Sequence, residues 1–341
     1  MEFLASDECE GRASGTPGGL LARRYVTDKL DGLGVRPAGV DGFHQLIPTI
    51  GGANIVGLIP AQRTDASYIV LGAHYDHLGV YFDTIHRGAD DNASGVAVLL
   101  DVSKSLLELQ SELDCNVLVI SFDSEEPPHF YEKTMGSIFF VDHPTIPLDV
   151  VHLMINLDLI GHAIGNPDAP PNLRNTVLVS GAERGGLHAM VNQYRSDDLS
   201  LRRLGANVML PSSDHHAFQN AGISSIFFNT GRDRHYHTPQ DTAEKLDYRK
   251  MLTLSDALTE LIVSASKCPP IRYDPNATDD ATTMETIRFL ADHQPEPTPH
   301  TTRALEVLGR LSEKHSNGSA LAPSDHVMLT RLLELFEKGL A

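Results

Sequence analysis

Runs of apolar, β-branched residues alternate with helical patterns from residue 54 to residue 265. In the clearest helical segment, 94–109, apolar residues such as Val98, Val102 and Leu106 recur near the 3.6-residue period. Such an alternation is typical of crossover units, which place parallel strands in one sheet and helices over both of its faces. The pattern therefore predicts an α/β fold, a three-layer α/β/α sandwich with a mostly parallel central sheet. We expect strands at 67–73, 116–122, 151–157, 176–180 and 224–229.

The sequence pattern changes near Cys268, where the alternation of strands and helices ends. Prolines at 269, 270 and 275 mark a linker, because proline ends helices and biases the preceding residue away from them. Helical patterns resume beyond it. We therefore expect a catalytic domain at 1–265, followed by a linker and a small helical C-terminal extension at 266–341. The further helices are expected at 18–33, 183–194, 214–220, 241–263, 284–293, 301–313 and 324–339.

Composition narrows the range of partners. The 341 residues carry 27 Lys and Arg against 45 Asp and Glu, a net charge of −18 at pH 7. A surface this acidic repels phosphate backbones and anionic lipids, so we expect no nucleic-acid partner and no membrane partner. Hydrophobic residues make up 41% of the chain, which excludes a disordered chain. Part of the acidity is expected to be local, where bound cations neutralise clustered carboxylates.

Cysteine usage and the N-terminal residues bear on location. The three cysteines include no CxxC pair, which favours free thiols in a reducing compartment over disulfides or a thiolate metal site. No basic and apolar leader is visible at the N-terminus. We expect a cytoplasmic protein, with a secreted or periplasmic location left open if a signal peptide has been removed.

Five short motifs carry the candidate chemistry. His74, Glu125, Glu126 and Asp158 fall just beyond the ends of three predicted strands, and Asp91 lies where a loop enters a helix. The carboxyl ends of parallel strands converge on the crevice where ligands bind, so these side chains are expected to meet. The motifs are GAHYDHLG at 72–79, GADDNASG at 88–95, SFDSEEP at 121–127, MINLD at 154–158 and HYHTPQDT at 235–242.

Each motif alone has an ordinary structural explanation, such as a helix cap or a turn. Together they are different, because four or five carboxylates in one crevice repel one another unless cations are present. Two divalent ions would supply the charge. Carboxylates and imidazoles without a thiolate suit zinc in a hydrolytic site, with Mn²⁺ or Co²⁺ as weaker options. Ligands shared between two ions leave positions open for water, which is typical of a catalytic site.

In residues and order, these motifs resemble the di-zinc aminopeptidases of the M28 metallopeptidase family. The resemblance covers roughly the first 265 residues and includes the opening segments FLASDECEGR at 3–12 and GTPG at 15–18. It implies the zinc-exopeptidase fold and two Zn²⁺ ions in each chain. It also implies that Asp91 bridges both metals and that the Asp91–Asn92 peptide is cis. The implied metal ligands are His74, Asp91, Glu126, Asp158 and His237.

The same resemblance implies roles for residues that do not hold metal. Glu125 matches the general base, and Asp76 matches the acid that orients the imidazole of His74. Tyr236 is a candidate donor to the developing oxyanion, with a packing role as the alternative. His235 and Asp90 are weaker candidates in place of His237 and Asp91. Asp214, His215 and Asp241 resemble residues that orient ligands, although helix capping explains them as well, and His77, His86 and His216 are not assigned as ligands.

The function expected is that of a zinc-dependent exopeptidase. The preferred hypothesis is that the protein is an aminopeptidase, which removes N-terminal residues from peptides through a metal-bridging hydroxide with Glu125 as general base. A carboxypeptidase or dipeptidase on the same di-metal site and a non-catalytic receptor or scaffold domain are the alternatives; a one-metal glutaminyl cyclase fits the ligand set less well. Segments 81–87, 128–135 and 166–174 are expected to shape the substrate pocket. The C-terminal helices would form a homodimer, cover the active-site mouth or stabilise the domain.

Overall fold

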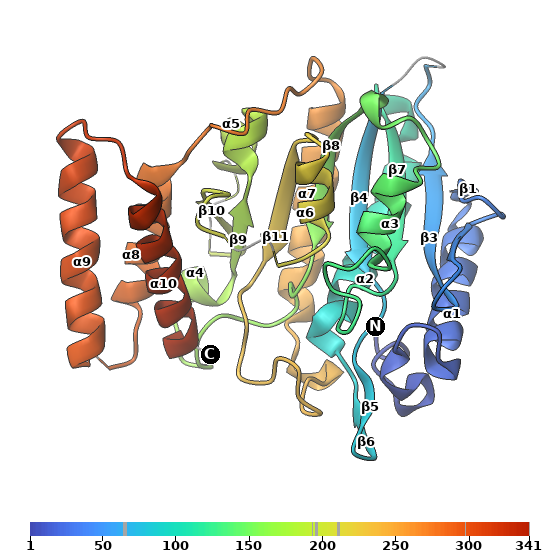
Figure 1. Cartoon of the computed structure of the whole chain (residues 1–341), viewed down its shortest axis with the longest axis horizontal. Helices are drawn as coiled ribbons and strands as arrows, with labels where there is room; N and C mark the ends of the chain where they lie inside the picture. Colours follow the sequence, from blue (N-terminus) through green and yellow to red (C-terminus); the bar gives the residue numbers. More distant parts are fainter. Residues whose placement is uncertain (64–66, 193, 195–196, 210–211, 297, 341) are drawn as a thin grey trace.

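The structure, a computed structural model, describes residues 1–63, 67–192, 194, 197–209, 212–296 and 298–340. A twisted sheet crosses the molecule in the order β1-β3-β7-β4-β8-β11-β9-β10, and β2 pairs with β3 (Figure 1). The strands of this sheet are β1 (Arg36–Pro37), β2 (His44–Ile47), β3 (Gly52–Ile59), β4 (Tyr68–His74), β7 (Asn116–Phe122), β8 (Val151–Leu157), β9 (Thr176–Ser180), β10 (Ser200–Leu204) and β11 (Ser225–Asn229).

The centre of the sheet is parallel. Strand β4 pairs in parallel with both β7 and β8, and β11 pairs in parallel with β8. Antiparallel pairs appear toward the two sides, where β3 joins β7 and β9 joins β11. Every residue of β7 and β8 is buried, which explains why their sequences are runs of apolar residues without alternation.

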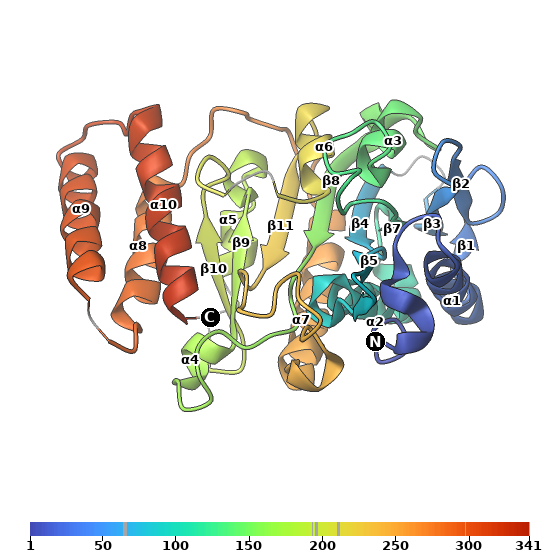
Figure 2. The same ribbon diagram turned by 60° about the horizontal axis from the view of Figure 1, so that its bottom comes forward.

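Helices cover both faces of the sheet (Figure 2). On one face, α1 (Pro17–Leu33), α2 (Gly95–Glu108), α5 (His188–Asn192) and α7 (Tyr248–Ser266) share a large apolar core with the strands. On the other face, α3 (Gly136–Asp142) and α6 (His215–Asn220) pack through Phe140 and Phe218 on residues such as Val70 and Leu118. The predicted α/β fold with a mostly parallel central sheet is confirmed.

The C-terminal helices lie beside strand β10, at one end of the sheet (Figure 1). They are α8 (Asp280–Asp292), α9 (Pro299–Ser316) and α10 (Pro323–Leu340). Apolar side chains from all three form one cluster with Leu178 and Leu204 of β9 and β10; Ile287, Leu308 and Phe336 are fully buried in it. The extension is therefore packed on the sheet, while the domain division at residue 265 stays a prediction.

Two helix predictions were too long. Two successive glycines, Gly185 and Gly186, interrupt the segment expected at 183–194, and the chain forms a 3₁₀ turn (Ala182–Gly185) before α5. The helix expected at 241–263 begins only at Tyr248, where the side chain of Asp247 accepts a hydrogen bond from the N–H of Lys250. Strands β1, β2, β3 and β10 of this sheet were not predicted, nor was a separate two-stranded sheet of β5 (Gly79–Tyr81) and β6 (Thr84–His86). No helix in the described part of the chain is long and apolar enough to cross a lipid bilayer.

Candidate metal centre

The parallel strands deliver their terminal side chains to one edge of the sheet. His74 is the last residue of β4, Asp158 directly follows β8, and Glu125 and Glu126 come shortly after β7. All four are buried, and the most exposed of them, Glu125, is only 6% exposed. A group of buried carboxylates without a cation is costly, because each charge has lost its hydration. This edge of the sheet is therefore the natural place for bound metal.

One group of donors consists of His74, Asp91 and Asp158. The Nε2 atom of His74 lies 3.4 Å from Oδ1 of Asp91 and 3.3 Å from Oδ1 of Asp158. One donor atom from each of the three side chains falls within 4.8 Å of the others. Three converging donors of this kind could supply part of the coordination sphere of a divalent ion.

A second group of donors forms around Asp91 and Glu126. Nε2 of His237 lies 3.0 Å from Oδ2 of Asp91 and 3.2 Å from Oε2 of Glu126. Among the described residues this nitrogen nevertheless has no hydrogen-bond partner. The three atoms therefore point toward a common space more than at one another. Burial lowers the pKa of His237, but Asp91 and Glu126 outweigh this effect and raise the pKa to about 10.

The structure adds His77, which sequence analysis had not assigned as a ligand. Its Nδ1 atom lies 2.9 Å from Oε1 of Glu126 and 3.9 Å from Oδ2 of Asp91, so His77, Asp91 and Glu126 form a compact donor group. Burial lowers the pKa of His77 well below its ordinary value, which keeps the ring neutral. A signal was present in the sequence, because His77 follows His74 by three residues in the same motif.

Asp91 contributes to both groups, and its loop is held from several directions. The carboxylate of Asp241 accepts hydrogen bonds from the N–H groups of Asp90 and Asp91, at 2.8 and 3.1 Å. The fully buried guanidinium of Arg12 donates to the carbonyl oxygens of Asp91 and Gly88. The Asp91–Asn92 peptide is cis, as the family resemblance implied. The hydrogen bonds from Arg12 and to Asp241 hold the backbone of this loop in place.

Asp76 lies behind the donors. Its two carboxylate oxygens accept hydrogen bonds from the backbone N–H groups of Glu125 and Glu126, each at 3.1 Å. Its Oδ1 atom also lies 3.5 Å from Nδ1 of His74. Burial raises the pKa of Asp76, but His74 and these backbone donors outweigh burial and lower the pKa below its ordinary value. A single carboxylate thus fixes the segment after β7 and approaches the ring of His74.

Glu125 stands apart from both donor groups. Its Oε2 atom lies 3.7 Å from Nε2 of His74, and it belongs to neither set of converging donors. Burial, together with the carboxylates of Asp158 and Glu126, raises the pKa of Glu125 well above its ordinary value. A carboxylate with a raised pKa, free of the donor groups, is suited to accept and return a proton.

The weaker candidates fall outside the two donor groups. Asp90 accepts hydrogen bonds from His162 and from the N–H of Gly161, both at 2.6 Å. His235 contacts Arg234 and lines a neighbouring cavity. Tyr236 stacks on the ring of His237, with ring centroids 3.8 Å apart, and lines the pocket beside the donors.

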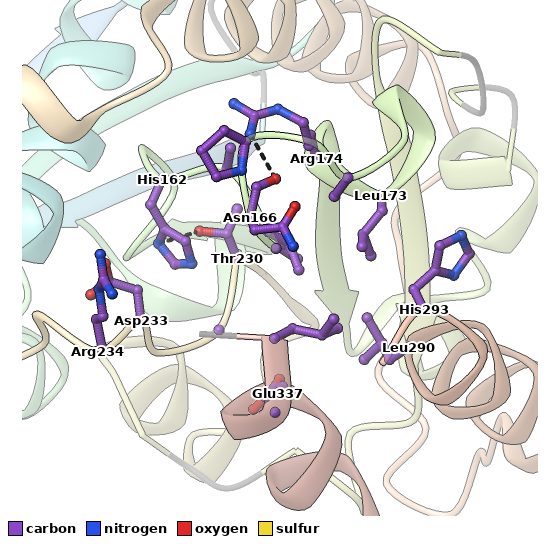
Figure 3. A pocket seen from close by; sticks show the side chains of 18 of the residues that line it. His162, Asn166, Leu173, Arg174, Thr230, Asp233, Arg234, Leu290, His293 and Glu337 are labelled. Atoms are coloured by element: carbon purple, nitrogen blue, oxygen red, sulfur yellow. Dashed lines mark hydrogen bonds between the residues drawn. The ribbon is translucent and has the colours of Figure 1, made fainter. Parts of the chain in front are cut away.

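The donors open into a cavity of about 200 Å³. Of the three segments expected to shape it, only 128–135 contributes, through Phe130. Segment 166–174 instead lines a larger cavity of about 670 Å³ next to it (Figure 3). The two cavities share Gly231, Arg232 and Glu337. We call the smaller cavity the catalytic pocket. Covering the active-site mouth was one of three roles expected for the C-terminal helices, and one wall of this pocket is formed by Thr330, Leu333, Glu334, Glu337 and Lys338 of α10.

The donor set fits zinc. Buried carboxylates and imidazoles converge without any thiolate, and donors shared by two groups would leave coordination positions for water. A mostly parallel α/β sheet with such a cluster at its carboxyl edge defines a metal-dependent hydrolase.

Comparison with known proteins identifies the family. The chain belongs to peptidase family M28, whose model matches residues 54–262. It is 31% identical to the uncharacterised protein YfbL of Escherichia coli K12 over 250 residues, which cover 65% of this chain and 74% of YfbL. The predicted class, a metallopeptidase of this family, is confirmed.

Solved structures show the same fold. The aminopeptidase LapA of Legionella pneumophila superposes with a TM-score of 0.62 at 17% identity, covering 78% of this chain and 69% of LapA. A zinc aminopeptidase from Bacillus subtilis superposes with a TM-score of 0.50 at 25% identity, covering 67% and 54% of the two chains. The chain spans about half the length of the curated aminopeptidases that it matches.

Proposed function

We propose that this protein is a zinc-dependent aminopeptidase that hydrolyses N-terminal residues from peptides. The observation that carries the proposal is the pair of buried donor groups that share Asp91, one with His74 and Asp158 and the other with His77 and Glu126. His237 lies 3.0 Å from Asp91 and 3.2 Å from Glu126. Two Zn²⁺ ions would be held by His74, Asp91 and Asp158 on one side and by Asp91, Glu126 and His237 on the other, with His77 next to the second group. Similarity to the zinc aminopeptidase of B. subtilis supports the choice of metal.

The protein residues would divide the chemistry between them. Bound zinc activates water and polarises the scissile carbonyl. Glu125 accepts the proton of the attacking water and returns it to the leaving amine, because it is buried beside the donors and its pKa is raised. Asp76 positions Glu125 and Glu126 through their backbone N–H groups.

Tyr236 is proposed as a donor to the substrate carbonyl oxygen as charge develops there. Burial raises the pKa of Tyr236 above its ordinary value, so the hydroxyl keeps its proton at neutral pH. The stacked ring of His237 limits its movement. A donor held in place before the reaction stabilises the transition state without reorganisation.

A carboxypeptidase or dipeptidase is the second candidate, because Arg232 and Lys338 line the same pocket and would suit a substrate carboxylate. A peptide-library digest read by mass spectrometry separates the two. We expect loss of N-terminal residues when zinc is supplied and none after chelation, with Glu125→Gln as an inactive control. Loss of C-terminal residues would overturn the aminopeptidase assignment, and unchanged peptides under zinc would overturn the enzymatic one.

A further inference from the structure

Helix α10 gives the catalytic pocket a wall that lies outside the family match at 54–262. Thr330, Leu333, Glu334, Glu337 and Lys338 follow one another at spacings of three and one, so they lie along one stripe of the helix. This stripe faces the pocket that also holds the metal donors. Substrate recognition by this wall would therefore be a property of the C-terminal extension.

Glu337 is an unpaired carboxylate on this wall. Within the described part of the chain it makes no hydrogen bond or ion pair, and burial raises its pKa to about 7. Its side chain packs closely over Gly231, where an added Cβ atom would lie 3.3 Å from Cδ and 3.4 Å from Oε1 of Glu337. A carboxylate confined in this way gains free energy when a cation replaces its lost hydration.

The position of Glu337 decides which part of a substrate could supply that cation. Glu337 lines both the catalytic pocket and the larger cavity beside it, whereas the metal donors line only the catalytic pocket. Glu337 thus lies where the catalytic pocket opens into the larger cavity. The α-ammonium of a peptide is separated from the scissile carbonyl by one carbon and must stay beside the metal. The group that reaches Glu337 belongs to the side chain of the N-terminal residue.

The apolar part of the lining of the catalytic pocket suits a long aliphatic stem. Lysine and arginine bury their methylene groups along apolar surfaces while the charged head reaches a polar partner. Beyond Glu337 the pocket joins the larger cavity, where Figure 3 shows Glu337 on α10 at one side. The apolar side chains of the catalytic pocket are Leu159, Val208, Met209, Phe227 and Leu333, with Pro127 and Phe130 nearby.

We propose that Glu337 is a specificity-determining residue, which binds the cationic side chain of an N-terminal lysine or arginine; this inference rests on the proposed aminopeptidase function. Two cations near Glu337 oppose the preference. Arg232 stacks over Tyr236, 4.7 Å from the ring centroid, and Lys338 is exposed on α10. If these two groups dominated the pocket, acidic N-terminal residues would be preferred instead.

Anilides of L-lysine and L-norleucine test the inference, because norleucine has the same aliphatic stem without the ammonium group. With zinc supplied, we expect the wild-type kcat/KM for lysine to exceed that for norleucine by about 10-fold or more. Glu337→Gln should lower kcat/KM for lysine by about 10–100-fold and change norleucine hydrolysis by less than about 3-fold. Glu313→Gln, which neutralises an exposed carboxylate of α9 that lines neither cavity, is the matched control and should change both substrates little.

Equal losses for both substrates in Glu337→Gln, or a wild-type preference for norleucine or for a glutamate anilide, would overturn the inference. In that case the proposed aminopeptidase function would still stand if the wild type hydrolyses the norleucine anilide and Glu125→Gln does not. Calorimetric titration of L-lysinamide and L-norleucinamide into the zinc-loaded Glu125→Gln protein gives the same contrast without turnover. A protein that hydrolyses neither anilide but binds lysinamide more tightly through Glu337 would refute the function and keep the subsite.

Discussion

The catalytic pocket has two walls of different origin. One, the strand-end wall, consists of the ends of β4, β7 and β8 with the loops of Asp91 and His237, and it carries the metal donors. The other, the helix wall, is a stripe of α10. The strands of the first wall are buried on both faces and paired on both sides, so their ends have little freedom. The second wall is one helix face that packs on the sheet through Leu329, Leu332 and Phe336. The comparison suggests that the strand ends fix the chemistry and that the attached helix sets the choice of substrate.

The largest effect is expected from a substitution of Asp91, the donor that both groups share. Asp91→Asn should lower both zinc content and activity, with kcat/KM falling by about 1000-fold or more, because both donor groups lose a charged ligand. Zinc per chain is measured by elemental mass spectrometry. Asp90→Asn is the adjacent control, since Asp90 bonds His162 and lies outside both donor groups. Retention of both zinc ions by Asp91→Asn would contradict a bridging role.

Glu125→Gln separates chemistry from metal binding within the same wall. The substitution keeps the size of the side chain but removes the proton acceptor, so kcat should fall by about 100- to 10,000-fold. Zinc content should equal that of the wild type. A variant that keeps most of its turnover would refute the general-base role, and one that loses its zinc would make Glu125 a ligand.

The two histidines of the second donor group offer a finer test. His237→Ala should weaken zinc binding more than His77→Ala, which should lower the affinity by about 10-fold, as expected for a residue that orients Glu126. Competition with a fluorescent zinc chelator measures both affinities. A larger loss for His77→Ala would make His77 the ligand and His237 its support.

The strand-end wall could be predicted from the sequence because its information is local. His74, Glu126 and Asp158 each lie within a few residues of an apolar run, and parallel strands bring their ends together. The roles of Asp91 and His237 instead came from the family resemblance. The structure does place His74, Asp91, Glu126, Asp158 and His237 at that edge. His77 was missed because a second histidine three residues after a ligand also fits a packed loop.

The helix wall could not be predicted in the same way. The apolar stripe of α10 is readable from its periodicity, but its docking site is not, because β10 was unpredicted and the packing partners Leu178 and Leu204 are far away in the sequence. From the sequence alone, Glu337 is indistinguishable from the other charged residues on the polar face of an amphipathic helix. Its partial burial accompanies the packing of α10 over Gly231, which the sequence does not reveal.

Paired leucine substitutions test whether α10 acts on substrate or only on stability. Leu333→Ala and Leu308→Ala each empty part of the same apolar cluster and should cost about 2–5 kcal/mol of unfolding free energy. Only Leu333 lines the catalytic pocket, so only Leu333→Ala should lower kcat/KM, by about 3- to 10-fold. Chemical denaturation and anilide kinetics measure the two effects. Equal kinetics in both variants would reduce α10 to a structural support.

The smallest expected effect concerns the pH dependence of stability. Because burial raises the pKa of Glu337 to about 7, the folded state holds this proton more tightly than the unfolded state, and stability from this group is lost as pH rises toward 7. Glu337→Gln should therefore raise Tm by about 2 °C at about pH 8 and leave it nearly unchanged at about pH 5. The charged groups facing Glu337 are Arg232 after β11 and Glu334 and Lys338 on α10, and His162, His235 and His293 line the adjoining cavity. Glu313→Gln, whose carboxylate is exposed on α9 and does not act on Glu337, serves as the control. An equal Tm shift at both pH values would show that Glu337 carries no buried charge, and the contrast between the two walls would then rest on shape alone.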